Sequence, residues 1–342
     1  MNSFMPAEWE LQDAIQITWP SKKTDWKDNL AQAEKCFLHI SQLITKYQKL
    51  IIIHSPIRNP KSLFTNKELL NICLIEANYN DTWARDYAPI SIIEDGISTL
   101  KNFIFNGWGN KYPSELDNKL NLFLLRKGIY RNISNVDFIL EGGSIESNGN
   151  GIILTTKKCL LNPNRNNKFN FKGIEHVLKN ELYAKKILWL ENGAIIGDDT
   201  DAHIDTLARF INSDSIVYVK CFDINNPNFE SLDKMERELK SFTNLNNKPF
   251  KLIPVPLISV IENEKKLPAT YVNFLITNKQ VLLPTYNCPE DKIVINIFKN
   301  MLPEKEIEPV YCGEIIKQNG SLHCLTMQLN ENTVAPNLFN HE

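Results

Sequence analysis

The segment Gly197-Asp-Asp-Thr-Asp-Ala-His-Ile-Asp-Thr-Leu-Ala-Arg-Phe210 places Asp199, Asp201, His203 and Asp205 two residues apart. If the segment is extended, the two-residue period of a strand puts these four polar side chains on one face. Three carboxylates and an imidazole on one face repel one another near neutral pH unless a metal ion or an organic cation lies among them. The sequence therefore predicts a cation-binding site in this segment.

Other interpretations of this segment can be compared by position. An EF-hand calcium loop starting at Asp199 is excluded, because Ile204 stands where the loop needs glycine and Phe210 where it needs glutamate. A zinc site that uses His203 and Asp205 with a third ligand from elsewhere stays open. An exposed strand edge with a solvated acidic run stays open too. The rest of the chain has to decide between them.

Tight turns and amphipathic helices alternate along the chain. Four turns, at residues 94–96, 148–151, 212–214 and 277–279, each separate two β-branched or aromatic stretches and predict strand pairs. Apolar residues at helical spacing predict five helices, over residues 28–47, 114–127, 171–184, 230–242 and 290–301. This alternation predicts an α/β fold.

Polar residues follow an apolar strand at five points: Asp86, Glu141, the 201–205 segment, Asn273, and the pair His323-Cys324. The intervals of about fifty to seventy residues are typical of a strand-rich unit repeated around an axis. We therefore expect a five-bladed α/β propeller whose repeats surround one central site. The apolar run 14–19 is expected to pair with the last unit and close the ring, which removes exposed edges.

Composition limits the function classes. The chain has 342 residues, 38 Lys and Arg against 40 Asp and Glu, and a net charge of -2. No basic surplus favours nucleic acid, and no polybasic run favours a membrane surface. The start lacks the basic and apolar parts of a secretory signal, and no apolar run approaches membrane-spanning length. We expect a single cytoplasmic domain, residues 1–342, that binds a small molecule.

The seven cysteines are odd in number and form no Cys-x-x-Cys pair. Most of them stand in apolar stretches and are interpreted as small core residues kept reduced. One cysteine with special surroundings could still serve as a nucleophile.

Six motifs, in order along the chain, resemble the agmatine deiminase family, which belongs with the bacterial peptidylarginine deiminases in the guanidine-modifying (pentein) superfamily. They are Met5-Pro-Ala-Glu-Trp-Glu10, Asn80-Asp-x-Trp-x-Arg-Asp86, Leu140-Glu-Gly-Gly-Ser-Ile145, Cys159-Leu-Leu-Asn-Pro-Asn-Arg165, Asp199-Thr-Asp-x-His-x-Asp205 and Leu322-His-Cys-Leu-Thr326. The matches extend from residue 5 to residue 326, and so over nearly the whole chain.

This resemblance implies a pentein propeller with no metal or organic cofactor, possibly as a homodimer. The implied reaction hydrolyses agmatine to N-carbamoylputrescine and ammonia, a step towards putrescine, through a covalent thiouronium intermediate. By matching each motif to the family, the resemblance implies that Cys324 is the nucleophile and that His203 acts as the acid and the base. The implied guanidinium-binding acids are Asp86, Glu141 and Asp205, while Asp199 would bind the distal amine and Trp83 would form a wall of the pocket.

The residue types suit this chemistry independently of the resemblance. A guanidinium is planar and cationic, so carboxylates bind it by paired, charge-assisted hydrogen bonds. A thiolate attacks its carbon far better near neutral pH than a hydroxyl does. One imidazole can protonate the departing ammonia and then activate water. Carboxylates near Cys324 are expected to raise the pKa of its thiol while the site is empty.

Two places depart from the family pattern. Members usually have three glycines and an asparagine where this chain has Gln318, Asn319, Gly320 and Ser321, and a glycine where it has Ala202. The added Cβ atoms are expected to narrow the pocket or to restrict opening of the loop.

Three rival functions remain. A deiminase of peptidyl-arginine or free arginine would use the same chemistry and give citrulline. Where its substrate carries a carboxylate, that group needs a basic residue in the site. The motifs offer mainly acidic residues, and Arg85 is the basic exception. A cysteine hydrolase of the protease type would pair Cys324 with His203 without needing the surrounding acids. A polyamine-binding propeller without catalysis would need the acids but not the thiol.

Overall fold

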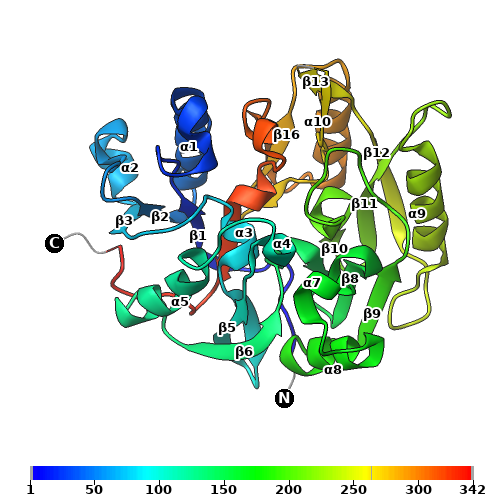
Figure 1. Cartoon of the computed structure of the whole chain (residues 1–342), viewed down its shortest axis with the longest axis horizontal. Helices are drawn as coiled ribbons and strands as arrows, with labels where there is room; N and C mark the ends of the chain where they lie inside the picture. Colours follow the sequence, from blue (N-terminus) through cyan, green and yellow to red (C-terminus); the bar gives the residue numbers. More distant parts are fainter. Residues whose placement is uncertain (1–2, 263, 340–342) are drawn as a thin grey trace.

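The computed structural model describes residues 3–262 and 264–339. Within this part of the chain, the strands form five sheets of three or four strands and one separate hairpin, β13 (Val260–Glu262) with β14 (Lys265–Leu267). The five sheets follow one another around the molecule, from β1–β3 through β5, β9 and β11 to β16 (Figure 1). The α/β class expected from the sequence is confirmed.

Each sheet repeats one design. A strand pairs antiparallel with the next, a helix follows, and a third strand then lies parallel to the second. Four of the sheets are β4 (Ile90–Glu94), β5 (Ile97–Ile104) and β6 (Ile133–Ile139); β7 (Ile145–Ser147), β8 (Ile152–Thr156) and β9 (Lys186–Leu190); β10 (Ala208–Asn212), β11 (Ser215–Lys220) and β12 (Lys251–Pro256); and β15 (Leu275–Ile276), β16 (Gln280–Thr285) and β17 (Glu306–Tyr311).

The fifth sheet joins the two ends of the chain. Its strands are β18 (Thr326–Asn330), β1 (Gln12–Thr18), β2 (Lys49–His54) and β3 (Ile72–Glu76). β1 lies antiparallel to β18, with Ile15 opposite Gln328, and parallel to β2. The predicted closure of the ring by the N-terminal apolar run is therefore confirmed.

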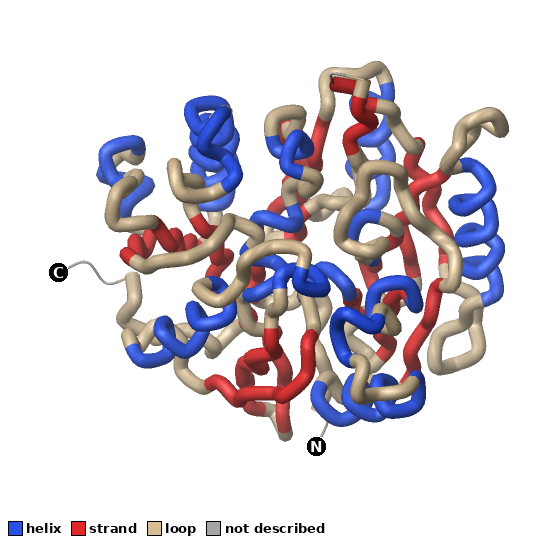
Figure 2. Tube along the Cα trace, in the orientation of Figure 1, coloured by secondary structure: helices blue, strands red, loops and turns tan. Residues whose placement is uncertain are grey.

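The connecting helices lie at the outside of the ring, and Figure 2 shows the strands further in. They are α1 (Leu30–Thr45), α5 (Asp117–Arg126), α8 (Phe171–Glu181), α9 (Phe229–Ser241) and α10 (Glu290–Met301). All five predicted helices are present, and their ends differ from the predicted ones by three residues or fewer. In α1 the apolar stripe Phe37, Ile40 and Ile44 is buried, which is the face that the helical spacing predicts.

Short helical turns stand at the entrance to the first strand of four units. They are α3 (Ala84–Tyr87), η3 (Gly142–Ser144), η4 (Ile204–Thr206) and η6 (His323–Leu325). α3 contacts η3 and η6, and η3 contacts η4, so these turns gather at the centre of the ring. Each of them holds, or directly follows, polar residues that the sequence singled out. The fold thus brings distant parts of the chain to one place.

Further single turns complete the helical part of the structure. They are α2 (Asn66–Leu69), α4 (Gly107–Asn110), α6 (Lys157–Leu160), α7 (Pro163–Asn166), η1 (Asp25–Asp28), η2 (Lys61–Leu63) and η5 (Ile315–Gln318). None of these short turns was expected from the sequence. In the described ranges, no helix combines the length and the apolar character that crossing a membrane requires.

The prediction that residues 199–205 are extended is wrong. Asp201 and Ala202 have φ angles of 69° and 65°, in the left-handed region, and the segment turns before η4 begins. The Asp198 carboxylate stabilises this turn by accepting hydrogen bonds from the Thr200 and Ala202 amides, at 3.1 and 2.7 Å. The four polar side chains therefore point in different directions and have different partners.

Candidate functional site

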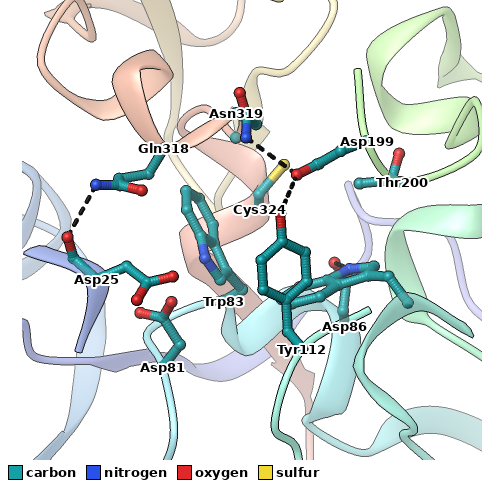
Figure 3. Close-up of a pocket in the computed structure, with 12 residues that line it drawn as sticks. Asp25, Asp81, Trp83, Asp86, Tyr112, Asp199, Thr200, Gln318, Asn319 and Cys324 are labelled. Atoms are coloured by element: carbon teal, nitrogen blue, oxygen red, sulfur yellow. Dashed lines mark hydrogen bonds between the residues drawn. The ribbon is translucent and has the colours of Figure 1, made fainter. Parts of the chain in front are cut away.

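A pocket opens at the centre of the ring, and Cys324 is one of the residues that line it (Figure 3). Its empty volume is roughly 460 Å³. The lining is acidic and aromatic, and it contains no lysine or arginine: Asp25, Asp81, Trp83, Asp86, Trp108, Tyr112, Asp199, Thr200, Gln318, Asn319, Gly320 and Cys324. Such a lining suits an organic cation with an apolar part.

Cys324 lies in η6 and is almost fully buried. Its Sγ atom lies 3.4 Å from Oδ1 of Asn273 and 3.8 Å from Oδ2 of Asp205. Burial raises the pKa of the thiol well above its usual value, and the Asp205 and Asp86 carboxylates raise it further. The direction expected from the sequence is confirmed, although burial contributes more than the carboxylates.

Asp86 lies in α3 and is held from two sides. Its Oδ2 accepts a hydrogen bond from the Trp108 indole at 2.8 Å, and its Oδ1 accepts one from the Gly143 amide at 2.9 Å. Oδ1 is also 3.7 Å from Nδ1 of His203. Burial raises the pKa of Asp86, and the nearby His203 partly opposes that shift. Trp108, which the sequence did not single out, thus fixes the orientation of the carboxylate.

Gly143 allows three of the predicted site residues to meet. A Cβ atom on it would lie 2.7 Å from Nδ1 of His203, 2.8 Å from Oδ1 of Asp86 and 3.1 Å from Oδ2 of Asp205. These separations are shorter than van der Waals contact, so a side chain here would push the three groups apart. The second glycine of the Glu-Gly-Gly motif is therefore needed for close approach.

His203 is buried directly before η4. Among the residues that the structure describes, neither of its ring nitrogens has a hydrogen-bond partner. Burial alone would lower the pKa of His203, but the nearby Asp86 and Cys159 outweigh burial and raise this pKa well above its usual value. The imidazole is thus a buried, uncommitted proton carrier beside the Asp86 carboxylate.

Glu141 does not line the pocket. Both of its carboxylate oxygens accept from Nε of Arg165, at 2.8 and 3.0 Å, and both side chains are fully buried. Arg165 also donates through Nη1 to Asp201 at 2.8 Å. The resemblance implied that Glu141 surrounds the guanidinium of a substrate, whereas the structure places it beside a guanidinium of the protein, close to His203 and Cys159. Arg165 ends one of the six motifs that carry the resemblance, but no role was predicted for it.

Asp205 is oriented by a buried network below the pocket. Its Oδ2 lies 2.8 Å from Nδ1 of His323, whose Nε2 lies 2.7 Å from Glu8. The His323 ring therefore bridges the two carboxylates, one at each nitrogen. Glu8 also accepts from Arg209 at 2.8 Å. Burial would raise the pKa of Asp205, but the hydrogen bond and charge of His323 outweigh burial and lower this pKa.

One oxygen of Asp205 remains free of the network. Its Oδ1 is buried and has no hydrogen-bond partner among the described residues. A buried carboxylate oxygen without a donor is costly unless a ligand supplies one. Oδ1 of Asp205 is therefore available to a cationic N–H donor that comes close to Cys324.

Asp199 lies at one side of the pocket. It accepts hydrogen bonds from the Tyr112 hydroxyl at 2.8 Å and from the Asn319 amide at 3.0 Å (Figure 3). Burial raises the pKa of Asp199, and these two donors oppose that shift. Asn319 has a φ angle of 65°, a conformation that glycine adopts easily. The departure from the family pattern thus adds a polar contact to Asp199, in addition to a Cβ atom.

Trp83 forms a wall of the pocket, as the resemblance implied. The ring lies flat against Gly320, where a Cβ atom would overlap with it. The retained glycine of the loop therefore makes room for the indole. Beyond Trp83, Asp25 and Asp81 also line the pocket, and the sequence did not single them out (Figure 3). Burial, together with the Asp25 charge, raises the pKa of Asp81 to about 7.

Arg85 lies outside the pocket lining. Its side chain is buried and donates to Gln328 at 2.6 Å, with Glu8 3.5 Å away. It is therefore not available to a substrate carboxylate.

The zinc alternative also changes. Among the described residues, His203 forms a group of potential metal ligands with Glu141 and Cys159, and Asp205 is not part of this group.

The comparisons with known proteins agree over nearly the whole chain. A model of the Porphyromonas-type peptidyl-arginine deiminase family matches residues 4–329. A crystal structure described as a candidate peptidyl-arginine deiminase is 44% identical, with a TM-score of 0.92 over 96% of this chain and 99% of that one. An agmatine deiminase of C. jejuni, a cysteine-to-serine variant with substrate bound, is 36% identical, with a TM-score of 0.91 over 96% and 97% of the two chains. A Mycoplasma capricolum protein named as a candidate agmatine deiminase is 30% identical over 95% of both chains.

Proposed function

Because this chain belongs to the Porphyromonas-type peptidyl-arginine deiminase family, we propose that it hydrolyses the guanidinium group of agmatine to N-carbamoylputrescine and ammonia. One observation carries the proposal: Cys324 lines a pocket of acids and aromatic rings, and its buried thiol lies 3.8 Å from Asp205, whose Oδ1 has no hydrogen-bond donor among the described residues. An agmatine deiminase with substrate bound is a structural neighbour at 36% identity.

Substrate binding would begin with charge pairing. The guanidinium would donate its N–H groups to Asp86 and to Oδ1 of Asp205, in paired bonds that hold its plane fixed. Its positive charge offsets the two carboxylates that raise the pKa of Cys324, so this pKa falls when the substrate is bound. The thiol then gives its proton to solvent, and the thiolate faces the guanidinium carbon.

Catalysis would proceed in two halves. In the first, the Cys324 thiolate adds to the guanidinium carbon, His203 gives a proton to one nitrogen, and ammonia leaves a thiouronium on the sulfur. In the second, the now neutral His203 takes a proton from water as the water adds to the same carbon. The carbon–sulfur bond then breaks and the new hydroxyl group gives its proton to the sulfur, which releases the ureido product and restores the thiol. The free ring nitrogens of His203 support this double role.

One side of the pocket favours an amine over a carboxylate. Asp199 lies there with Tyr112 and Asn319, and none of the described residues that line the pocket is cationic. Lys111, which lies close by, donates to the Asp199 carbonyl and to Asp201, so its charge is already paired. We propose that Asp199 binds the primary amine of agmatine and that Trp83 and Trp108 enclose its methylene chain.

The second candidate is a deiminase of peptidyl-arginine or free arginine. The observation that favours it is the 44% identity with a crystal structure described as a candidate peptidyl-arginine deiminase. Free arginine and a C-terminal arginine carry an α-carboxylate, which would meet Asp199 without a cation to balance it. An internal arginine has no such charge, but it brings no cation to the carboxylate of Asp199.

The test compares substrates directly. Ammonia release is measured with agmatine, free arginine, a C-terminal arginine peptide and an internal arginine peptide, each with and without a chelator. We expect agmatine to have the highest kcat/KM, unchanged by the chelator, and Cys324→Ser to abolish the activity. A preference for either peptide would transfer the assignment to the second candidate. Ammonia release by Cys324→Ser at the wild-type rate would end the deiminase proposal.

We also propose that the protein acts in the cytoplasm as a single domain, and that it forms homodimers. All seven cysteines are unpaired, which suits a reducing compartment. Sedimentation at two protein concentrations measures the oligomeric state, and a mass of one chain at both would contradict the dimer.

A further inference from the structure

A buried cluster beside the pocket has the composition of a metal site. Glu141, Cys159 and His203 offer a carboxylate oxygen, a thiol sulfur and an imidazole nitrogen, all within 4.8 Å of one another. None of the three residues lines the pocket that contains Cys324. We propose that this cluster binds a zinc ion, and that the ion inhibits the enzyme by occupying His203.

The geometry of the cluster comes close to what zinc requires. Tetrahedral zinc with sulfur at about 2.3 Å and nitrogen or oxygen at about 2.0 to 2.2 Å places its donor atoms roughly 3.3 to 3.8 Å apart. The three donors lie within 4.8 Å of one another, so binding requires these separations to shorten by roughly 1.5 Å at most. Both nitrogens of His203 lack a hydrogen-bond partner among the described residues, so coordination breaks no existing bond of the ring. A water molecule would complete the fourth position.

The donor types select the ion. Thiolate and imidazole favour zinc and chemically similar divalent ions over magnesium and calcium, which prefer oxygen ligands. Cys159 lies in α6 and is fully buried, and its thiol gives up a proton when the metal binds. Glu141 keeps acceptor capacity, because a carboxylate has about four lone-pair positions and Nε of Arg165 approaches both oxygens from one side. The same arginine holds the carboxylate in place.

The inhibitory consequence rests on the proposed function. In that reaction His203 carries the proton to ammonia and away from water, and an imidazole nitrogen bound to zinc carries no proton. Zinc in this cluster leaves Asp86, Asp199 and Cys324 free in the pocket. Substrate can therefore still bind, and the ion should lower kcat far more than it changes KM. A metal bound by the nucleophile would instead compete with the substrate.

Direct binding tests the site without any assay of activity. The protein is dialysed against EDTA. One sample is then titrated with zinc, and a chromogenic chelator counts the bound ions. A second sample is titrated with cobalt, and its absorption spectrum is recorded. We expect one ion per chain in the wild type and in Cys324→Ser, with thiolate-to-cobalt charge-transfer absorption in both. Cys159→Ser should lose the ion and the absorption. If instead Cys324→Ser loses both and Cys159→Ser keeps both, the proposal is overturned.

Kinetics tests the mode of inhibition. Cys159→Ser should keep metal-free activity but with a shifted pH dependence, because Cys159 lies outside the pocket lining yet contributes to the raised pKa of His203. With zinc, the wild type should lose roughly tenfold or more in kcat with KM within about twofold, while Cys159→Ser stays active. Zinc that raises KM without lowering kcat would refute the inference. If Cys159→Ser does not fold, Cys159→Ala replaces it, and the Cys324→Ser titration decides alone.

Discussion

Gly143→Ala is predicted to separate the three groups that meet at the site. The Cβ atom would lie 2.7 Å from His203, 2.8 Å from Asp86 and 3.1 Å from Asp205, where unstrained contacts need about 3.4 Å or more. The φ angle of Gly143 is not in the left-handed region, so alanine can adopt the backbone conformation. The effect of this substitution is therefore steric.

The magnitude follows from the required displacements. Removing the overlaps needs shifts of roughly 0.3 to 0.7 Å in three groups at once, and a misplacement of about 1 Å in a catalytic site costs on the order of 10²-fold. We expect kcat/KM for agmatine to fall by about 10²-fold, equivalent to about 2.7 kcal/mol of transition-state stabilisation. The Asp86 carboxylate also moves away from the Gly143 amide, so kcat should fall more than KM rises.

The assay is steady-state ammonia release, with circular dichroism and thermal unfolding to verify the fold. Gly173→Ala in α8 is the matched control, because its Cβ would meet mainly the mobile side chain of Phe169, and alanine favours the helix. That variant should keep wild-type kcat/KM. If Gly143→Ala also keeps kcat/KM within about threefold, close assembly of the three groups is not required for catalysis, and the reasoning fails.

Three further predictions follow from the site. Iodoacetamide should label Cys324 of the empty protein more slowly than it labels an ordinary exposed thiol, because the pKa of the Cys324 thiol is raised. The labelling rate should increase as the pH rises above neutrality. Peptide mass spectrometry measures this rate, and fast labelling at pH 7 would contradict the prediction. Asp199→Asn should raise KM for agmatine about tenfold with a smaller change in kcat, since it removes the charge that pairs with the amine; equal KM values would exclude that role. His323→Gln should lower the free energy of unfolding by about 1 to 3 kcal/mol, because glutamine cannot bridge the buried Asp205 and Glu8 carboxylates and one of them loses its hydrogen bond. The lowered pKa of Asp205 contributes stability that is present above its unfolded pKa and lost as the pH falls, so this variant should begin acid unfolding at a higher pH than the wild type; unchanged unfolding curves across the acid range would contradict this.

The repeat of strands and helices could be predicted because its signals are local. The apolar stripe of α1 and the turn at residues 94–96 both depend on residues that are close together in the sequence. Each lies near its predicted place in the structure. The prediction for the 199–205 segment failed for a related reason. Side-chain hydrogen bonds from Asp198 compete with the extended backbone there, and residue spacing does not reveal such a competition.

The missed site residues lacked any signal of this kind. Trp108 reaches Asp86 from a turn where its own φ angle is 56°, and no periodic pattern marks such a position. Arg165 and Glu141 are separated by 24 residues, and His323 and Glu8 by 315. Pairing across such distances depends on how the sheets come together, which one sequence does not state. The roles proposed for Cys324 and the other site residues stay predictions until the variants are measured.

The pairing of β1 with β18 has a consequence for how the protein is made. Residues 12–18 are synthesised before their partner strand β18 and before the thiol of Cys324, which directly precedes that strand. Until β18 is made, the nascent polypeptide exposes one unpaired edge of β1, which favours chaperone binding and association with other chains. A product terminated before residue 324 would therefore expose this edge and also lack the thiol that we propose as the nucleophile.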